Sequence, residues 1–198
     1  AQCLVGSEMC IRDRYHSFKN KKLCPLIYKT ERDFEYLGSN MHQFVDKRMQ
    51  PLSPFLYTSE DLQKYCEGKF GAYIVGSDQI WRAIYVPDIA NYFLDFTLGW
   101  NVKRIAYAAS FGTQNPEYTQ EEKEICCKLI PQFDAISLRE KSGKHVFTNF
   151  CWEYNDLEIV LDPTLLLNSG DYTKLLSYEE EEINAGIFYY VLDKNQYI

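Results

Sequence analysis

The chain has 198 residues, of which 46% are hydrophobic and 25% charged, as in an ordinary globular protein. Its formal net charge is −7, so the chain lacks the excess of positive charge that binds phosphate backbones, and no nucleic-acid partner is expected. The 7 cysteines form no C-x-x-C pair or zinc spacing, which favours a reducing cytoplasm and no metal site. No apolar run is long enough to cross a bilayer, so we expect no transmembrane segment, although a membrane-bound substrate stays open.

The amino-terminal segment, residues 1–14, resembles a translated sequencing adapter. We therefore expect it to be non-native, and the alternative is a native, frayed terminus. Residues 15–178 are expected to form part of an amino-terminal Rossmann-like domain. Residues 179–198 are expected to hold a linker and the first strand, Gly186 to Leu192, of a truncated second domain.

Two helices are predicted before the first strand. Apolar residues at helical spacing predict an amphipathic helix from Glu31 to Met49, and Ser59 is expected to cap a second, short helix. The apolar run Ala72 to Val75 then predicts a strand that is buried on both faces, because its apolar residues do not alternate with polar ones.

Further strands and helices alternate along the rest of the chain, which predicts an α/β fold with a parallel sheet, flanking helices and right-handed crossovers. We expect Ile125, Leu129 and Ile130 to form the inner face of a helix capped by Thr119. The predicted strands cover Tyr92 to Phe96, Lys103 to Gly112, Phe133 to Glu140 and Leu157 to Thr164, and the helices cover Tyr118 to Ile130, Lys141 to Phe150, Leu165 to Asn168 and Asp171 to Ser177.

Polar residues follow each strand of the expected sheet, and ligands of parallel sheets bind beyond the carboxyl ends. These ends should converge on a small-molecule crevice. Asp78 is the first candidate for a catalytic residue, although capping of a turn explains it about as well. The candidate substrate-binding residues are Gly76, Ser77, Gln79, Trp81, Ser110, Phe111, Gly112, Arg139, Glu140, Asp162 and Thr164.

Several of these candidates have a structural alternative. Trp81 is more often a core anchor than a platform for sugars, and Arg139 with Glu140 fits an ion pair at a helix start. Asp162 before Pro163 fits a helix cap. No dinucleotide or phosphate-loop motif names a nucleotide, so a generic nucleotide-binding protein ranks last.

Five stretches carry motifs in a recognisable order: Tyr73 to Trp81, Tyr92 to Phe96, Arg104 to Gly112, Ile136 to Glu140 and Leu161 to Leu166. Together they resemble the polysaccharide pyruvyl transferases over most of Phe44 to Leu192. The resemblance implies the amino-terminal domain of a two-domain, GT-B-type transferase. It also implies transfer of pyruvate from phosphoenolpyruvate, without a cofactor, to a glycan acceptor that is either free or lipid-linked, in the cytoplasm or at the inner membrane face.

The chain departs from the family pattern by omission. It shows no opening strand with an Asn-Tyr-Gly-type turn, and only one strand of the second domain is expected. Because none of His16, His42 and His145 occupies a matching position, the catalytic histidine of the family is carried onto no residue. We therefore expect the fragment itself to be inactive. The alternative is a non-catalytic glycan- or protein-binding module with the same fold.

Overall fold

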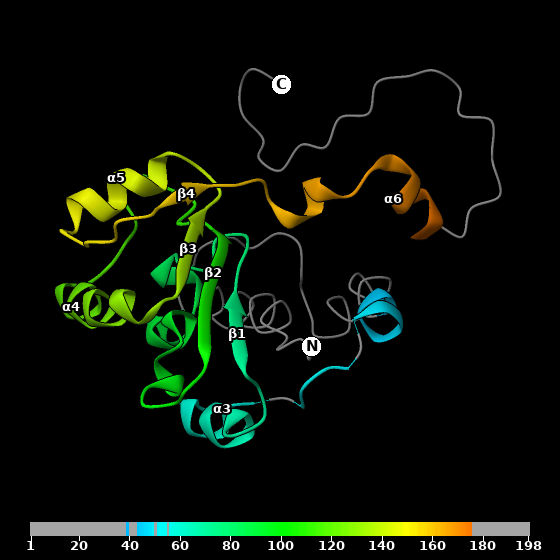
Figure 1. The fold of residues 1–198 in the computed structure, drawn as a ribbon, viewed down its shortest axis with the longest axis horizontal. Helices are drawn as coiled ribbons and strands as arrows, with labels where there is room; N and C mark the ends of the chain where they lie inside the picture. Colours follow the sequence, from blue (N-terminus) through cyan, green and yellow to red (C-terminus); the bar gives the residue numbers. More distant parts are fainter. Residues whose placement is uncertain (1–38, 40–42, 50, 55, 176–198) are drawn as a thin grey trace, which may run out of the picture. The chain divides into compact units, whose positions relative to one another are not determined.

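The computed structural model describes residues 39, 43–49, 51–54 and 56–175 (Figure 1). The chain divides into two compact units, residues 1–163 and 164–198. Within the described part of the expected first helix, residues 43–48 are helical. The segment 1–14, the strand Gly186 to Leu192 and a domain boundary after residue 178 lie outside the described residues and stay predictions.

A four-stranded, all-parallel sheet forms the centre of the first unit, as the alternation of strands and helices predicts (Figure 1). Its strands lie in the order of the sequence, and each pairs with the next in parallel register. The fold class is therefore α/β with a Rossmann-like sheet. The strands are β1 (Ala72–Val75), β2 (Lys103–Ala109), β3 (Ala135–Leu138) and β4 (Glu158–Ile159).

The helices of this unit are mostly those expected from the sequence. Thr119 caps α4 in a capping box with Glu122, whereas the cap of α3 is Thr58 and not Ser59. The Thr58 hydroxyl accepts the Asp61 N–H at 3.0 Å. The helices are α3 (Ser59–Cys66), η1 (Ala83–Tyr85), η2 (Ile89–Phe93), η3 (Asp95–Thr97), α4 (Gln120–Leu129), η4 (Ile130–Gln132) and α5 (Ser142–Asn149).

The predicted strand from Tyr92 to Phe96 is wrong, because this stretch forms parts of η2 and η3. These two 3₁₀ helices meet at Leu94, whose φ of 60° is left-handed. Phe93, the last residue of η2, and Phe96, in the middle of η3, are both buried in the core. The demand for two buried aromatic rings therefore overrides the local preference for a strand.

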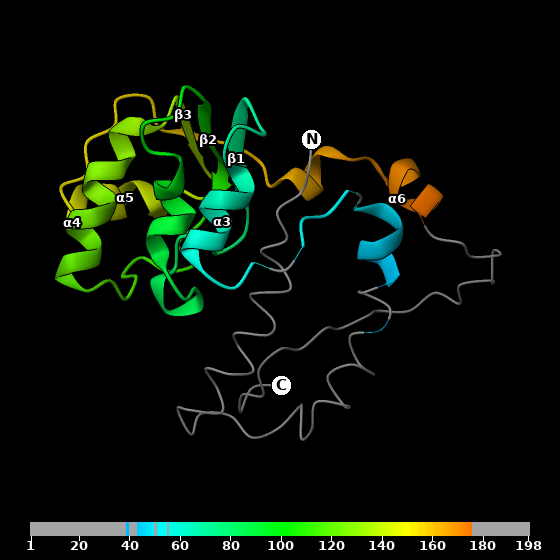
Figure 2. The same ribbon diagram turned by 90° about the horizontal axis from the view of Figure 1, so that it is seen from below.

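The sheet is covered on one face by described residues. Figure 2 looks along the strands and shows α3, α4 and α5 on the same side of the sheet. The side chains on that face are buried, and Gly143 of α5 lies directly against Leu138 of β3. On the other face Ile74 is 68% exposed, so the expectation that β1 is buried on both faces is wrong for the described structure.

The core is built around Trp81, which is fully buried. Its ring stacks on Phe93 at 4.7 Å between centroids, and its indole N–H donates to the Tyr92 carbonyl at 2.9 Å. Phe111, Phe147 and other aromatic rings surround it. In α4 the buried residues are Cys126 and Leu129, and Ile130 after the helix is buried too, so the inner positions of Leu129 and Ile130 are confirmed. Ile125 is 38% exposed, so its expected inner position is wrong.

The second unit contains short helical segments, as the sequence predicts. They are η5 (Pro163–Leu166), which begins at the last residue of the first unit, and α6 (Ser169–Leu175). The Tyr172 hydroxyl donates to the Thr164 carbonyl within this unit. Among the described residues, no helix is both long and apolar enough to cross a membrane.

Candidate active site

The carboxyl ends of β1, β2, β3 and β4 bring together five of the predicted site residues. Each strand in a parallel sheet delivers the residue that follows it to the same edge, which explains why residues up to 84 positions apart meet here. We call this group the Arg139 cluster. It consists of Asp78, Ser110, Arg139, Glu140 and Asp162.

Arg139 is the centre of the cluster and contacts every other member. Its Nη1 lies 3.3 Å from Asp78 Oδ1 and 3.5 Å from Asp162 Oδ2, and its Nε lies 3.4 Å from Glu140 Oε2. Its Nη2 donates to the Ser110 hydroxyl at 3.2 Å. The rigid planar fork of the guanidinium thus fixes three carboxylates at one sheet edge.

Ser110 joins the cluster to the core and is fully buried. Its hydroxyl donates to Glu140 Oε1 at 2.8 Å and accepts the Gly112 N–H at 2.9 Å. Its carbonyl accepts the backbone N–H of Trp81 at 3.1 Å. A buried hydroxyl with this many partners is a fixed point, because moving it would leave several polar groups unpaired.

Two glycines allow the backbone to pass close to its neighbours at this edge. At Gly76, whose φ is 151°, a Cβ atom would lie 1.9 Å from the Tyr107 carbonyl oxygen. At Gly112, whose φ is 68°, a Cβ would lie 2.1 Å from the Gln79 side-chain oxygen. Both positions therefore require glycine, and Gly112 makes room for the amide of Gln79.

The remaining predicted site residues fall into different environments. Ser77 is half-buried beside Asp78, and Gln79 is half-buried on Gly112. Trp81 and Phe111 have no exposed surface, so their expected contact with substrate has no surface to support it, and they instead pack beneath the site. Thr164 belongs to the second unit, and its role stays a prediction.

The charges of the cluster are unbalanced, with one guanidinium against three carboxylates. Partial burial opposes the charge of Arg139, but Glu140 and Asp78 outweigh this and raise the pKa of the guanidinium. Exposure differs among the carboxylates, since the side chain of Asp78 is 72% exposed and that of Asp162 only 15%. Asp78 is therefore the carboxylate that a ligand reaches most easily.

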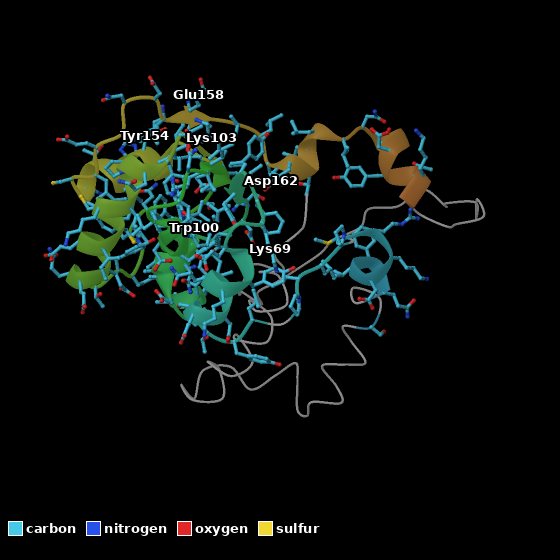
Figure 3. The ribbon with its side chains drawn as sticks, turned by 60° about the horizontal axis from the view of Figure 1, so that its bottom comes forward. Lys69, Trp100, Lys103, Tyr154, Glu158 and Asp162 are labelled. Carbon is cyan, nitrogen blue, oxygen red and sulfur yellow. The ribbon has the colours of Figure 1, made fainter. Side chains whose placement is uncertain are left out.

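Shallow hollows of the described surface lie elsewhere, at the amino ends of the strands. They are lined by residues such as Gly71, Trp100 and Lys103, and no member of the Arg139 cluster lines them. Figure 3 draws the side chains and labels Trp100 and Lys103 of the hollows and Asp162 of the cluster. The cluster is the stronger candidate site, because it assembles charged groups from three strands and a hydroxyl from the fourth. No group of acidic, histidine or cysteine side chains within the described ranges could hold a metal ion.

Comparison with known protein families decides the wider identity. The model of one family, described as polysaccharide pyruvyl transferase, matches residues 8–198. The chain belongs to the polysaccharide pyruvyl transferase family. This agrees with the family that the five ordered motifs indicate, and it makes a glycan acceptor the expected partner. No curated protein and no solved structure matches the chain.

In this member of the polysaccharide pyruvyl transferase family, one group of residues near the cluster could not be predicted from the sequence. It is centred on Arg82. Arg82 donates two hydrogen bonds to Glu117, at 2.7 and 3.1 Å, and one to the Gln79 side-chain oxygen at 3.2 Å. It also donates to the Tyr85 hydroxyl at 2.9 Å. Glu117 is 35 residues from Arg82 and follows a turn, so no local pattern connects the two.

Proposed function

We propose that this chain carries the acceptor-binding side of an enzyme that transfers pyruvate from phosphoenolpyruvate to a sugar and closes a cyclic ketal. The sugar belongs to a surface polysaccharide or its lipid-linked precursor. Membership of the polysaccharide pyruvyl transferase family supports the transfer of pyruvate to a glycan. The observation that carries the acceptor assignment is the Arg139 cluster, where an exposed carboxylate stands at the carboxyl edge of the sheet.

The chemistry requires two sugar hydroxyls and one enol phosphate. Both hydroxyl oxygens form bonds to carbon 2 of the enol, whose bond to the phosphate oxygen breaks. One hydroxyl proton ends on carbon 3, which becomes the methyl group, and the other leaves with phosphate or solvent. An enzyme must therefore orient the hydroxyls and take up a proton from them, which suits a carboxylate.

Asp78 is the residue that we assign to the attacking hydroxyl. Its Oδ1 is held by Arg139 at 3.3 Å, while the side chain stays 72% exposed. Contact with a guanidinium fixes the orientation of the carboxylate without burying it. Asp78 therefore has both the access and the fixed geometry that a hydrogen-bond acceptor for a sugar hydroxyl needs.

Arg139 is assigned to holding carboxylates and not to binding the donor. Phosphoenolpyruvate carries a carboxylate and a phosphate, and the cluster presents it with three carboxylates against one guanidinium. A site with this charge favours a neutral sugar over an anion. Cations that bind the donor must therefore come from outside the cluster, and we expect the 198-residue chain alone to show no turnover.

Because phosphoenolpyruvate is a cytoplasmic metabolite, we place the reaction in the cytoplasm or at the inner membrane face.

The test uses the full-length gene product with phosphoenolpyruvate and methyl glycosides of glucose, galactose and mannose. Phosphate release and the mass of the sugar product report ketal formation. Asp78→Asn keeps the shape of the side chain but removes the base. We therefore expect the rate of ketal formation to fall by at least roughly 100-fold, with an unchanged circular dichroism spectrum. Asp156→Asn makes the same chemical change at an exposed position and should behave as wild type.

Wild-type activity in Asp78→Asn would remove this residue from the mechanism. If the wild-type protein binds a sugar but releases no phosphate from phosphoenolpyruvate with any of the three glycosides, a non-catalytic glycan-binding module is favoured instead. The two results are separable, because the first needs an active wild-type enzyme and the second excludes one.

A further inference from the structure

The side chain of Gln79 is held in one orientation by a neighbour that can only donate hydrogen bonds. Arg82 Nη1 lies 3.2 Å from Gln79 Oε1. A guanidinium has five N–H donors and no acceptor, so the atom of the amide that faces it must be the carbonyl oxygen. The amide nitrogen, with its two N–H donors, then lies on the other side of the planar group. Arg82 therefore removes the usual ambiguity between the two ends of a glutamine.

Arg82 is itself fixed by contacts that make it a rigid anchor. Glu117 accepts two of its N–H groups, at 2.7 and 3.1 Å, and the Tyr85 hydroxyl accepts a third at 2.9 Å. The guanidinium carbon also lies 4.5 Å from the centre of the Tyr85 ring. Bidentate pairing and stacking together favour this one position of the guanidinium.

Gly112 supplies the surface on which the amide rests. Because a Cβ there would lie 2.1 Å from Gln79 Oε1, the amide touches the Gly112 backbone directly. The Gly112 N–H is in turn bonded to the Ser110 hydroxyl of the Arg139 cluster. Gln79 thus lies between an anchor, Arg82, and the cluster that holds Asp78.

We propose that Arg82, with Glu117 and Tyr85, positions Gln79 so that its amide nitrogen donates to a sugar oxygen next to the hydroxyl bound by Asp78. Asp78 accepts a hydrogen bond and Gln79 donates one, so adjacent residues offer complementary partners to two oxygens of one sugar. Arg82 is a positioning residue in this scheme and touches no substrate. The identity of the ligand rests on the proposed function, whereas the fixed orientation of Gln79 does not.

The orientation is tested first, on the 198-residue chain without ligand. The side-chain NH₂ group of Gln79 is assigned in a nitrogen-15 correlation spectrum by its loss in Gln79→Glu, and its heteronuclear NOE is measured. We expect a rigid value in wild type and a mobile one in Arg82→Lys and Glu117→Gln, because lysine has no planar fork and glutamine is uncharged. Glu60→Gln removes an exposed ion pair in α3 and is the matched control, with a wild-type value expected. Equal mobility in wild type, Arg82→Lys and Glu117→Gln would overturn the proposal.

The functional part is tested in the full-length gene product with phosphoenolpyruvate and the same methyl hexosides. Gln79→Glu keeps an oxygen for Arg82 but replaces the donor, so we expect KM for the sugar to rise about tenfold, as for the loss of one hydrogen bond. KM for phosphoenolpyruvate should stay within about twofold, and Arg82→Lys should show the same pattern more weakly. A general loss of folded enzyme would lower the apparent kcat and leave both KM values unchanged, so it would not give this pattern.

An unchanged KM for the sugar, or an equal rise for both substrates, would overturn the assignment of Gln79. If wild type turns over none of the sugars, the proposed function fails, and the NMR comparison still decides the orientation of Gln79. Should Arg82→Lys not fold, Glu117→Gln carries both measurements, because it weakens the pairing that fixes Arg82 without removing the guanidinium.

Discussion

Arg104 shows how a single charged residue can be buried against backbone and hydroxyl acceptors. It is 8% exposed, and its guanidinium donates to the Thr97 hydroxyl at 2.7 Å and to the carbonyls of Trp100 and Val102 at 3.1 and 3.2 Å. These acceptors belong to the turn that leads into β2. The guanidinium therefore donates to backbone carbonyls of an irregular stretch. In a helix or a strand, backbone N–H groups would pair with such carbonyls.

Arg104→Lys is expected to lower the free energy of unfolding by roughly 2–3 kcal/mol, because a lysine cannot reach all of these acceptors at once. Urea unfolding followed by tryptophan fluorescence measures the change. Arg48→Lys makes the same substitution at an exposed position and should have almost no effect. A stability of Arg104→Lys equal to that of wild type would show that the acceptors are satisfied in another way.

At the scale of one element, β2 reaches the active site through a bulge near its carboxyl end. The register with β3 shifts between Ala106 and Ala109, and Ala108 has a φ of 49°. The Ser137 hydroxyl on β3 accepts the Ala108 N–H at 3.0 Å and donates to the Ala106 carbonyl at 3.2 Å. Ser137 thus pairs the backbone groups that the bulge removes from the ladder, and the bulge directs Ser110 towards Arg139.

Ser137→Ala should lower the free energy of unfolding by about 1–2 kcal/mol, because it leaves the Ala108 N–H and the Ala106 carbonyl without this partner. Thermal unfolding of the chain measures the loss. Ser137→Thr keeps the hydroxyl and is expected to retain most of the stability. If alanine and threonine destabilise equally, the cause is side-chain packing and not the hydrogen bonds.

The bulge also shows which features of the structure can be predicted from the sequence. The four strands of the sheet, their parallel direction and the convergence of Asp78, Arg139 and Asp162 could be predicted, because apolar runs and the geometry of parallel sheets determine them. The bulge could not, since Ala108 adopts a positive φ without the glycine that usually marks one. The pairing of Arg82 with Glu117 depends on tertiary contact and likewise leaves no local pattern.

At the scale of the whole first unit, the order of the strands determines which face of the sheet is covered. Successive strands advance in one direction, and right-handed crossovers then place every connection on the same face. The burial of Tyr73, Ile136 and Leu138 on that face agrees with this rule. Among the described residues, the opposite face keeps Ile74 exposed and leaves Ile105 and Tyr107 only half-buried.

Acidic pH is expected to destabilise the molecule through carboxylates that are paired in the native state. The hydrogen bond from Arg82 lowers the pKa of Glu117 below its ordinary value of 4.5, and the one from Lys103 lowers the pKa of Asp134 below 3.8. A lowered native pKa contributes stability above the ordinary value, and this is lost as the pH falls through the native one. Burial raises the pKa of Asp95 and acts in the opposite sense.

We therefore expect the melting temperature of wild type to fall as the pH decreases from about 5 to about 3. Glu117→Gln should melt at a lower temperature than wild type at about pH 6, and the two curves should converge at the acidic end. Calorimetry across this range measures both. Parallel curves at all pH values would mean that Glu117 does not contribute to the acid dependence.

Ser110 has one further consequence, for how the protein tolerates substitution. Ser110 is fully buried; its carbonyl accepts the Trp81 N–H, and its hydroxyl donates to Glu140 at the edge of the sheet that carries the carboxylates. Small shifts of the aromatic core are therefore transmitted to the site through a residue that has no room to adapt. In a library of random variants, conservative changes around Trp81 should reduce turnover before they reduce the yield of folded protein.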